Sequence, residues 1–450
     1  MPSLPQSTEN RPTGAQQLRS GLGLMASEWR TFGGPAYRRY LVLALSQGVV
    51  LALSGTSLII PLLLVLGLGP GPTTLVASLA LIGPAAQLAV PGVLRATDGN
   101  LRLVSVVSTA LGETRGIWIG LLAALAALGA GQGVLIAGLV VGTAAMGVFS
   151  GVAAANLQAW LAVILPEQER RFVAPRIVGL GLAVSAVLLV VVAVLLDAAV
   201  RAFGLGAYAA CFVIGGAAGI VEVVALARLP RPGRVRVPRL APEMPPPPGW
   251  RRFVSIATLA SLGSGLAPYY SVYVISVLRA SAAFAVALNA LTSAAAVVAS
   301  TFGAAMLAHN SSSRLLRLGY LSLGTGWVAA LATAPINPLA LPWFVAVALF
   351  VSAGGAIVQI ATNERLFRLV AGPTVMAQQG RFVGITSAAT AAGQLASALA
   401  LAVAPVGYPV FAALFVVSGG ARFVAASRLP VPEAWSDATA VINVADLRRN

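Results

Sequence analysis

The sequence predicts an all-α polytopic membrane protein with twelve transmembrane helices arranged in two six-helix halves. First, 58% of its 450 residues are hydrophobic and 9% are charged, and the mean hydropathy is +0.88. That is more apolar surface than a soluble domain could bury in one core. Second, runs long enough to cross about 30 Å of hydrocarbon recur twelve times. Third, one long basic stretch rich in proline separates the first six runs from the last six.

The apolar runs are about twenty residues long and are bounded by charges or by turns rich in glycine and proline. Helices are the spanning form that we expect, because a helix closes its backbone hydrogen bonds within one segment. The twelve expected spans are 41–66, 73–94, 103–127, 133–160, 177–199, 205–228, 253–276, 282–307, 315–333, 339–362, 379–403 and 408–427.

The basic residues predict how these spans are oriented. All 29 of them are arginines, and they gather before the first span, in every second connection after it, and in the tail. The alternate connections, such as GAGQG at 129–133, are nearly uncharged. The positive-inside rule therefore predicts a multi-pass protein of the cell (inner) membrane with both termini in the cytoplasm.

The longest basic connection predicts the domain organisation. A weak repeat supports two halves, since Arg171-Phe172-Val173 opens the fifth expected span and Arg381-Phe382-Val383 opens the eleventh. The expected units are a cytoplasmic N-terminal segment at 1–40, a first half at 41–228, a central loop at 229–252, a second half at 253–427 and a cytoplasmic tail at 428–450.

The rarest residues argue against several classes of function. The only cysteine, Cys211, lies in an apolar run, so an intrachain disulfide is excluded. A single histidine, His309, argues against a zinc site and against a Ser-His triad. We therefore expect no enzyme activity, no metal and no cofactor. The arginines are scattered between apolar runs rather than clustered on one soluble face, so the expected partner is the lipid bilayer and not nucleic acid.

The six-plus-six pattern with a basic central loop resembles the major facilitator superfamily over about residues 38–428. The stretch NLQAWLAVILPEQERRFVAPR is similar to the loop between the fourth and fifth helices of poorly characterised prokaryotic members, and Arg422 in FVVSGGARF matches an arginine late in their last helix. Besides Trp160, the matching residues of the cytoplasmic-loop motif are Pro166, Arg170, Phe172 and Arg176. The resemblance implies alternating access around a central site for a small molecule.

The best-known signature of that superfamily, an acidic and basic loop after the second span, is only partly present. GVLRATDGNLRL keeps Gly92, Asp98, Gly99 and Arg102 with altered spacing, and the counterpart after the eighth span has no acid. This departure leaves two hypotheses open. One is a secondary transporter; the other is a transport-inactive membrane assembly or partner protein that keeps the fold.

Three ionisable residues are expected at membrane depth, where charge is costly and usually functional. Glu113 and Arg115 fall near the middle of the third expected span, and Glu222 lies about two turns from the inner end of the sixth. Glu113 is a candidate proton or substrate site, and Glu222 is a candidate partner of Arg115. The alternative is that they pair with neighbouring helices and fix the packing, since the resemblance implies that the third span lies outside the central cavity.

Polar residues on spans one, four, seven and ten are candidates for lining a substrate cavity, because the resemblance implies that these spans surround it. Thr390 and Gln394 on span eleven are candidates because their spacing of four residues makes a polar stripe on one helical face. The alternatives are that small polar residues join helices in lipid, and that the tyrosines belong to an interface belt. Hydrophobic cavity helices favour an amphiphilic or apolar solute. The candidates are Gln47, Thr56, Asn156, Tyr269, Tyr270, Gln359, Asn363, Thr390 and Gln394.

Overall fold

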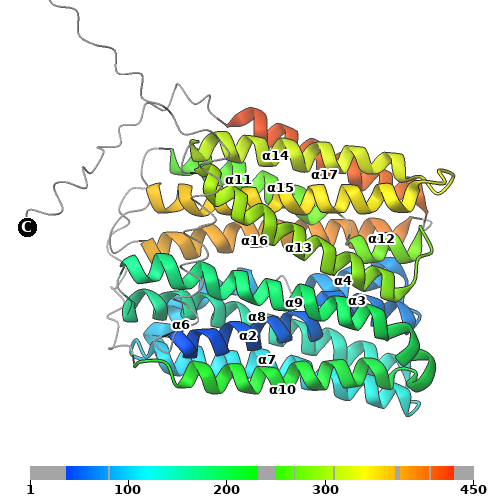
Figure 1. The fold of residues 1–450 in the computed structure, drawn as a ribbon, viewed down its shortest axis with the longest axis horizontal. Coiled ribbons are helices and arrows are strands. Elements are labelled where there is room, and N and C mark those ends of the chain that lie inside the picture. Colours follow the sequence, from blue (N-terminus) through cyan, green and yellow to red (C-terminus); the bar gives the residue numbers. More distant parts are fainter. Residues whose placement is uncertain are drawn as a thin grey trace, which may run out of the picture.

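Helices running side by side along one direction make up the protein (Figure 1). The computed structural model describes residues 37–79, 82–165, 167–231, 249–267, 269–307, 310–369, 375–404 and 407–429, and every regular element within them is helical. Twelve helical crossings can be followed through these residues. The fold class predicted from the sequence is confirmed: an all-α membrane protein with twelve spans in two six-helix halves.

The first half contains six crossings, of which the first and second are each divided into shorter helices. Figure 1 shows these helices together in the lower part of the view. They are α2 (Arg38–Leu53) with α3 (Thr56–Val65); α4 (Pro70–Leu79), α5 (Ile82–Ala86), η2 (Gln87–Ala89) and α6 (Val90–Ala96); α7 (Leu101–Ala127); α8 (Gln132–Ile164); α9 (Glu167–Phe203); and α10 (Gly206–Ala227).

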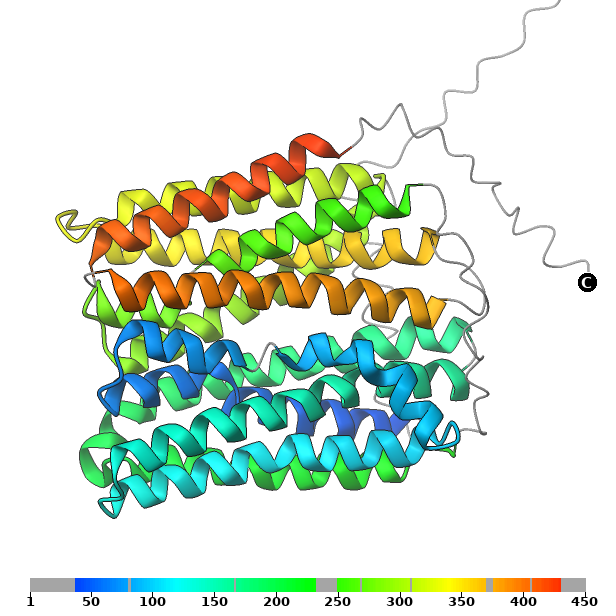
Figure 2. The same cartoon turned by 180° about the vertical axis from the view of Figure 1, so that it is seen from behind.

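The second half contains the other six and occupies the upper part of the same view. The helices are α11 (Trp250–Leu266) with α12 (Tyr270–Ser276); α13 (Ala282–Leu307); α14 (Ser312–Ala329) with η3 (Ala330–Thr333); α15 (Ala340–Leu369); α16 (Val375–Val403); and α17 (Tyr408–Arg428). Figure 2 shows the same two groups from behind.

The helix breaks follow the local sequence. Pro84 and Pro91 interrupt the second crossing, and Pro268 stands in the sequence where α11 gives way to α12, because proline lacks the amide hydrogen that a continuous helix needs. Within the described residues, ten stretches are long and apolar enough to span a bilayer. The second and seventh crossings are divided into pieces that are too short to meet that test alone.

The two halves repeat the same helix packing. In the first half α7 packs on α8 and α10, and α2 packs on α9 and α10; in the second half α14 packs on α15 and α17, and α11 packs on α16 and α17. Each pair in one half therefore has a counterpart in the other. The halves meet where α9 packs on α13 and α4 packs on α16, two contacts that the repeat also relates to each other.

Arginines fix the end of the last helix in each half. Arg39 donates a hydrogen bond to the carbonyl of Arg228 at 2.9 Å, and Arg102 donates to Ala227 at 2.8 Å. The second half repeats this, with bonds from Arg252 to the carbonyl of Arg428 at 2.9 Å and from Arg317 to that of Leu429 at 2.5 Å. A helix C-terminus leaves carbonyls unpaired and carries partial negative charge, so cationic donors stabilise it.

Candidate functional site

A cavity of about 570 Å³ opens inside the second half. Its walls come from α11, α12, α14, α15, α16 and α17, so one half supplies all of its lining residues. The walls combine serine, glutamine and asparagine side chains with aromatic rings and one arginine. A volume of this size falls within the range of small-molecule sites.

Five of the residues predicted to line a cavity lie in this wall. Tyr269 and Tyr270 line it beside the break between α11 and α12, and Gln394 lines it from α16. Gln359 and Asn363 are exposed on α15, where the Gln359 Nε2 donates to the Asn363 Oδ1 at 3.3 Å. Gln394 is only 5% exposed, and its Oε1 has no hydrogen-bond partner among the described residues.

The other four predicted residues lie outside this wall. Thr390 is one turn from Gln394, and its hydroxyl donates to the carbonyl of Thr386 at 3.0 Å, which satisfies it within α16. Gln47 and Thr56 are half-buried in the first half. Asn156 is fully buried in α8, where its Nδ2 donates to the carbonyl of Val152 at 2.9 Å and its Oδ1 has no partner among the described residues.

Arg422 of α17 is a cavity residue that the sequence did not identify as a site. Its side chain is 3% exposed, and its Nη1 donates to the carbonyls of Gly263 at 3.2 Å and Ser418 at 3.0 Å and to the Ser418 hydroxyl. Its Nη2 donates to the hydroxyl of Ser264 at 3.1 Å. Nε has no acceptor among the described residues. These bonds orient the guanidinium and leave part of it unpaired.

Gly263 explains how the arginine comes so close to the backbone of α11. A Cβ atom at this position would lie 2.8 Å from the Cβ of Ala421 and 3.3 Å from the carbonyl oxygen of Ser418. Glycine therefore lets α11 and α17 approach closely and exposes the Gly263 carbonyl, which accepts from both the Ser418 hydroxyl and Arg422. The only sequence signal for Arg422 was its match to an arginine of a known family. A single arginine near the end of a membrane helix typically indicates an anchor at the membrane surface.

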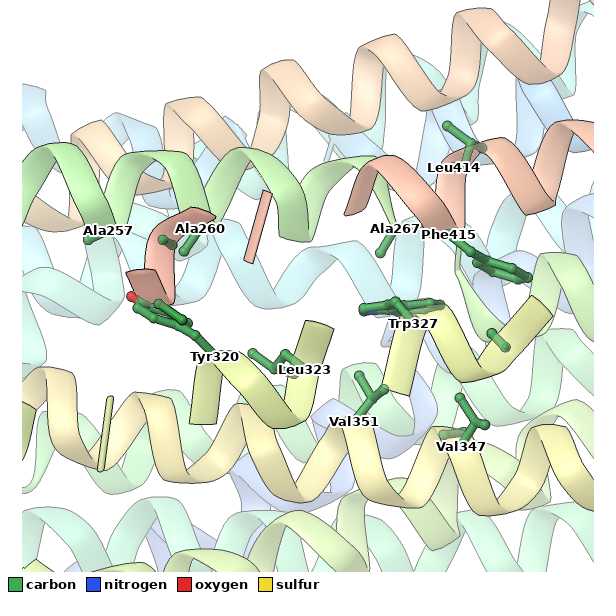
Figure 3. Close-up of a cluster of buried hydrophobic side chains, with 14 of the residues drawn as sticks. Ala257, Ala260, Ala267, Tyr320, Leu323, Trp327, Val347, Val351, Leu414 and Phe415 are labelled. Atoms are coloured by element: carbon green, nitrogen blue, oxygen red, sulfur yellow. The ribbon is translucent and has the colours of Figure 1, made fainter. Parts of the chain in front are cut away.

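Stacked aromatic rings form the wall next to the arginine. The guanidinium carbon of Arg422 lies 6.0 Å from the ring centroid of Trp327, within the range of a cation–π contact. Tyr270 and Phe415 each stack on Trp327, with centroids 5.7 and 5.4 Å from it. Figure 3 shows Trp327 between Phe415 of α17 and Val351 of α15. The rings give the cavity a rigid apolar surface beside a positive charge.

The predicted charges of the first half lie in a helix interface and not in this cavity. Glu113 of α7 packs against Gly219 of α10, where a Cβ would stand 3.1 Å from the Glu113 Oε2. Glu222 is one turn further along α10 and is 6% exposed, and the two carboxyl groups act on each other electrostatically. Among the described side chains, neither Glu113 nor Glu222 forms an ion pair with Arg115 at a distance of 4 Å or less. The Nε of Arg115 and the Oε2 of Glu222 are buried there without partners.

The cytoplasmic-loop motif can be placed only in part. Pro166 lies outside the described residues, and so do the side chains of Arg170, Phe172 and Arg176. Trp160 of the same stretch is fully buried, and its Nε1 donates to the carbonyl of Pro230 at 2.9 Å. This bond ties the end of α8 to the segment after α10.

Comparison with known proteins gives structural likeness without sequence likeness. No protein-family model matches the sequence, and neither does any curated protein. A bacterial homologue of the iron transporter ferroportin, in its inward-facing state, is 16% identical over 88% of this chain and 98% of its own, with a TM-score of 0.66. Its outward-facing state gives 0.59 at 17% identity, over 87% and 98% of the two chains.

Two further solved structures lead to the same result. The inward-open xylose transporter XylE from E. coli is 12% identical over 87% of this chain and 95% of its own, with a TM-score of 0.65. The nucleoside transporter NupG is 13% identical over 88% and 98%, with a TM-score of 0.61. These likenesses confirm the fold that the sequence predicted from its resemblance to the superfamily.

Proposed function

We propose that this chain, which has the major facilitator fold, is a secondary transporter that moves a small amphiphilic solute by alternating access between its two halves. The cavity in the second half carries the proposal. It is large enough for a small organic molecule, and it combines an aromatic wall with hydrogen-bonding groups from α11, α15 and α16. It lies next to the α11–α12 break, and discontinuous helices are typical of transporter sites.

The packing between the halves supports a state that opens toward the cytoplasm. The distal segments α3 and α12 of the first and seventh crossings pack on each other, and α4 packs on α16 at the same end, where Gly71 meets the backbone of Ala402. The greater likeness to the inward-facing than to the outward-facing ferroportin homologue agrees with this. Transport then requires the opposite state, in which these distal contacts separate.

The orientation belongs to the same proposal. We place both termini and the 229–252 loop in the cytoplasm and the chain in the inner membrane, because the arginine-rich connections lie on one side. The arginines that cap α10 and α17 fall on that side as well. A cysteine introduced in the loop 129–131 should react with a membrane-impermeant thiol reagent applied to intact cells, whereas a cysteine that replaces Arg314 should not react.

The direct test is transport by vesicles that contain the purified protein. We expect protein-dependent accumulation of one or a few members of a broad panel of small organic solutes, measured by mass spectrometry of the vesicle contents. Gln359→Ala should weaken accumulation because it removes a cavity group, whereas Gln47→Ala in the first half should leave it nearly unchanged. No protein-dependent solute across the panel would contradict the proposal.

The other hypothesis, a transport-inactive partner protein, predicts a different result. It is motivated by the altered loop after the second crossing, where Asp98 and Gly99 remain without the full signature. Such a protein should co-purify with a defined membrane complex, and the Gln359→Ala substitution should change neither the complex nor any flux. Flux that depends on the cavity would decide against it.

A further inference from the structure

Resting on the proposed function, the geometry points to a substrate class: a small organic anion whose acidic group binds Arg422 and whose apolar body lies against Tyr270 and Trp327. The charge balance of the second half supports this class. Between residues 253 and 427 the sequence contains a single acidic residue, Glu364. The second half therefore contains a single carboxylate that could neutralise any of its several arginines.

Glu364 does not neutralise Arg422. It follows Asn363 on α15 but is not itself part of the cavity wall that contains Arg422. Glu364 also has interactions of its own. No salt bridge to Arg422 within 4 Å occurs in the part of the chain that the structure describes, so its positive charge is unpaired.

The hydrogen bonds of the guanidinium leave donors for a ligand. The carbonyls of Gly263 and Ser418 and the Ser418 hydroxyl occupy Nη1, whereas Nη2 has one acceptor, the hydroxyl of Ser264. Nε has none among the described residues. Nε and Nη2 lie side by side on one edge of the guanidinium plane, which is the edge that pairs with the two oxygens of a carboxylate.

Burying Arg422 without a counter-ion costs free energy. A ligand-binding role therefore explains its burial better than a purely structural role does. A buried charge without a counter-ion is strongly destabilising, and carbonyl contacts compensate only in part. An anionic solute would pair with the charge, and the cavity admits one because Arg422 stands in its wall. The aromatic surface of Tyr270 and Trp327 fits an apolar body beside the acid group.

The cavity also specifies a polar contact away from the acid group. Gln394 faces the same space from α16, and its buried Oε1 lacks a hydrogen-bond donor among the described residues. A solute that carries a hydroxyl or amide hydrogen would satisfy it. A cation is disfavoured, because it would meet Arg422 and find no carboxylate in the wall.

The experiment compares ligands that differ only in charge. Equilibrium binding to the purified protein is measured for phenylacetate, benzoate and hexanoate, for the amide of each acid, and for phenethylamine. We expect at least one acid to bind roughly tenfold or more tightly than its amide, since hydrogen bonds to charged groups contribute about 1.5–3 kcal/mol. Phenethylamine should not bind. If no acid binds better than its amide, the inference is overturned.

Variants locate the effect at the arginine. Arg422→Gln should lower the affinity for the acid by roughly tenfold or more and leave that for the amide unchanged. Arg422→Lys should be intermediate, because it keeps the charge but loses the planar pair of donors. Arg314→Gln is the matched control, since it removes one exposed arginine of the same half outside the cavity. Equal losses in the Arg422→Gln and Arg314→Gln variants would overturn the assignment.

The lipid composition of the vesicles distinguishes two sources of the bound anion, a lipid head group and a free solute. Binding is repeated in vesicles of phosphatidylcholine alone and in vesicles that also contain phosphatidylglycerol. If phosphatidylglycerol displaces phenylacetate from the wild type, the arginine holds a lipid head group and the solute assignment fails. Acid binding that depends on Arg422 without any flux would defeat the transporter proposal alone, and flux of a neutral solute unaffected by Arg422→Gln would defeat this inference alone.

Discussion

The last helix of each half carries one buried ionisable residue at the same distance from its capped end, an acid in the first half and a base in the second. Glu222 stands six residues before Arg228, whose carbonyl accepts from Arg39; Arg422 stands six residues before Arg428, whose carbonyl accepts from Arg252. The helix packing around the two positions is also equivalent. The repeat therefore conserves the scaffold while the buried chemistry differs between the halves.

The difference lies in what each charge faces. Glu222 is in the α7–α10 interface near Glu113, where two carboxyl groups share one region and Arg115 forms no ion pair within 4 Å among the described side chains. Arg422 faces a cavity and an aromatic ring. A charge buried between helices favours a role in packing or proton binding, whereas a charge in a cavity wall favours a ligand. Matched substitutions in the two halves test how far their equivalence extends.

The largest expected effect comes from close helix packing. In the second half, a Cβ at Gly265 would lie 2.0 Å from the carbonyl oxygen of Thr390, a backbone atom that cannot move away. In the corresponding α2–α9 contact, a Cβ at Gly48 would lie 2.6 Å from the carbonyl of Gly181. Gly265→Ala should therefore destabilise by about 3 kcal/mol or more, and Gly48→Ala should cost less.

The measurement is the apparent Tm and the monodisperse yield in detergent. Gly355→Ala is the control, because a Cβ there meets nothing within 4 Å and alanine is the better helix former. If Gly265→Ala behaved like Gly355→Ala, the α11–α16 contact would not be as close as described.

The next effect concerns the partly buried caps. Arg317 and Arg102 donate to the ends of α17 and α10, at 2.5 and 2.8 Å. Replacing either with glutamine should destabilise by about 1–2 kcal/mol, because it leaves a carbonyl without a cationic donor at a helix C-terminus. Equivalent halves predict similar losses of apparent Tm. A loss confined to one variant would show that the caps are not equivalent in energy.

The sequence was informative about the fold for a clear physical reason. Apolar length and arginine placement predict spans directly, and all twelve predicted spans correspond to helical crossings. The breaks in the second and seventh crossings follow from proline positions. The long basic connection and the Arg-Phe-Val repeat then predicted the two-half arrangement, and the structural neighbours confirm that fold.

The site was less predictable, because it depends on which helix faces meet. Tyr270, Gln359 and Gln394 could be proposed from polarity on an apolar helix, and they do line the cavity. Asn156 shows the same polarity but bonds within its own helix. Arg422 looked like a surface anchor, since its burial depends on Gly263 allowing α17 to approach α11. That contact joins residues 159 apart in the sequence, and no local pattern reports it.

A smaller effect is expected at the exposed caps. Arg39 and Arg252 make bonds of 2.9 Å in exposed surroundings. Exposed charges contribute well under about 1 kcal/mol, and salt screens them. Arg39→Gln and Arg252→Gln should therefore lower the apparent Tm by less than the Arg102→Gln and Arg317→Gln variants do, and the difference from wild type should shrink in high salt. A loss as large as that of Arg317→Gln would contradict this ranking.

The smallest effect on stability is expected at Glu222, and it separates the two buried charges most sharply. Glu222→Gln keeps the shape of the side chain, and the Glu222 Oε2 has no partner among the described residues to lose. The free energy of unfolding should change by less than about 1 kcal/mol or increase, so the apparent Tm should stay close to that of the wild type or rise. Glu222→Gln should also leave acid binding unchanged, whereas Arg422→Gln should weaken it by roughly tenfold or more. If Glu222→Gln instead weakened acid binding as strongly, the α7–α10 interface and the cavity would be coupled, and the two halves would share one site.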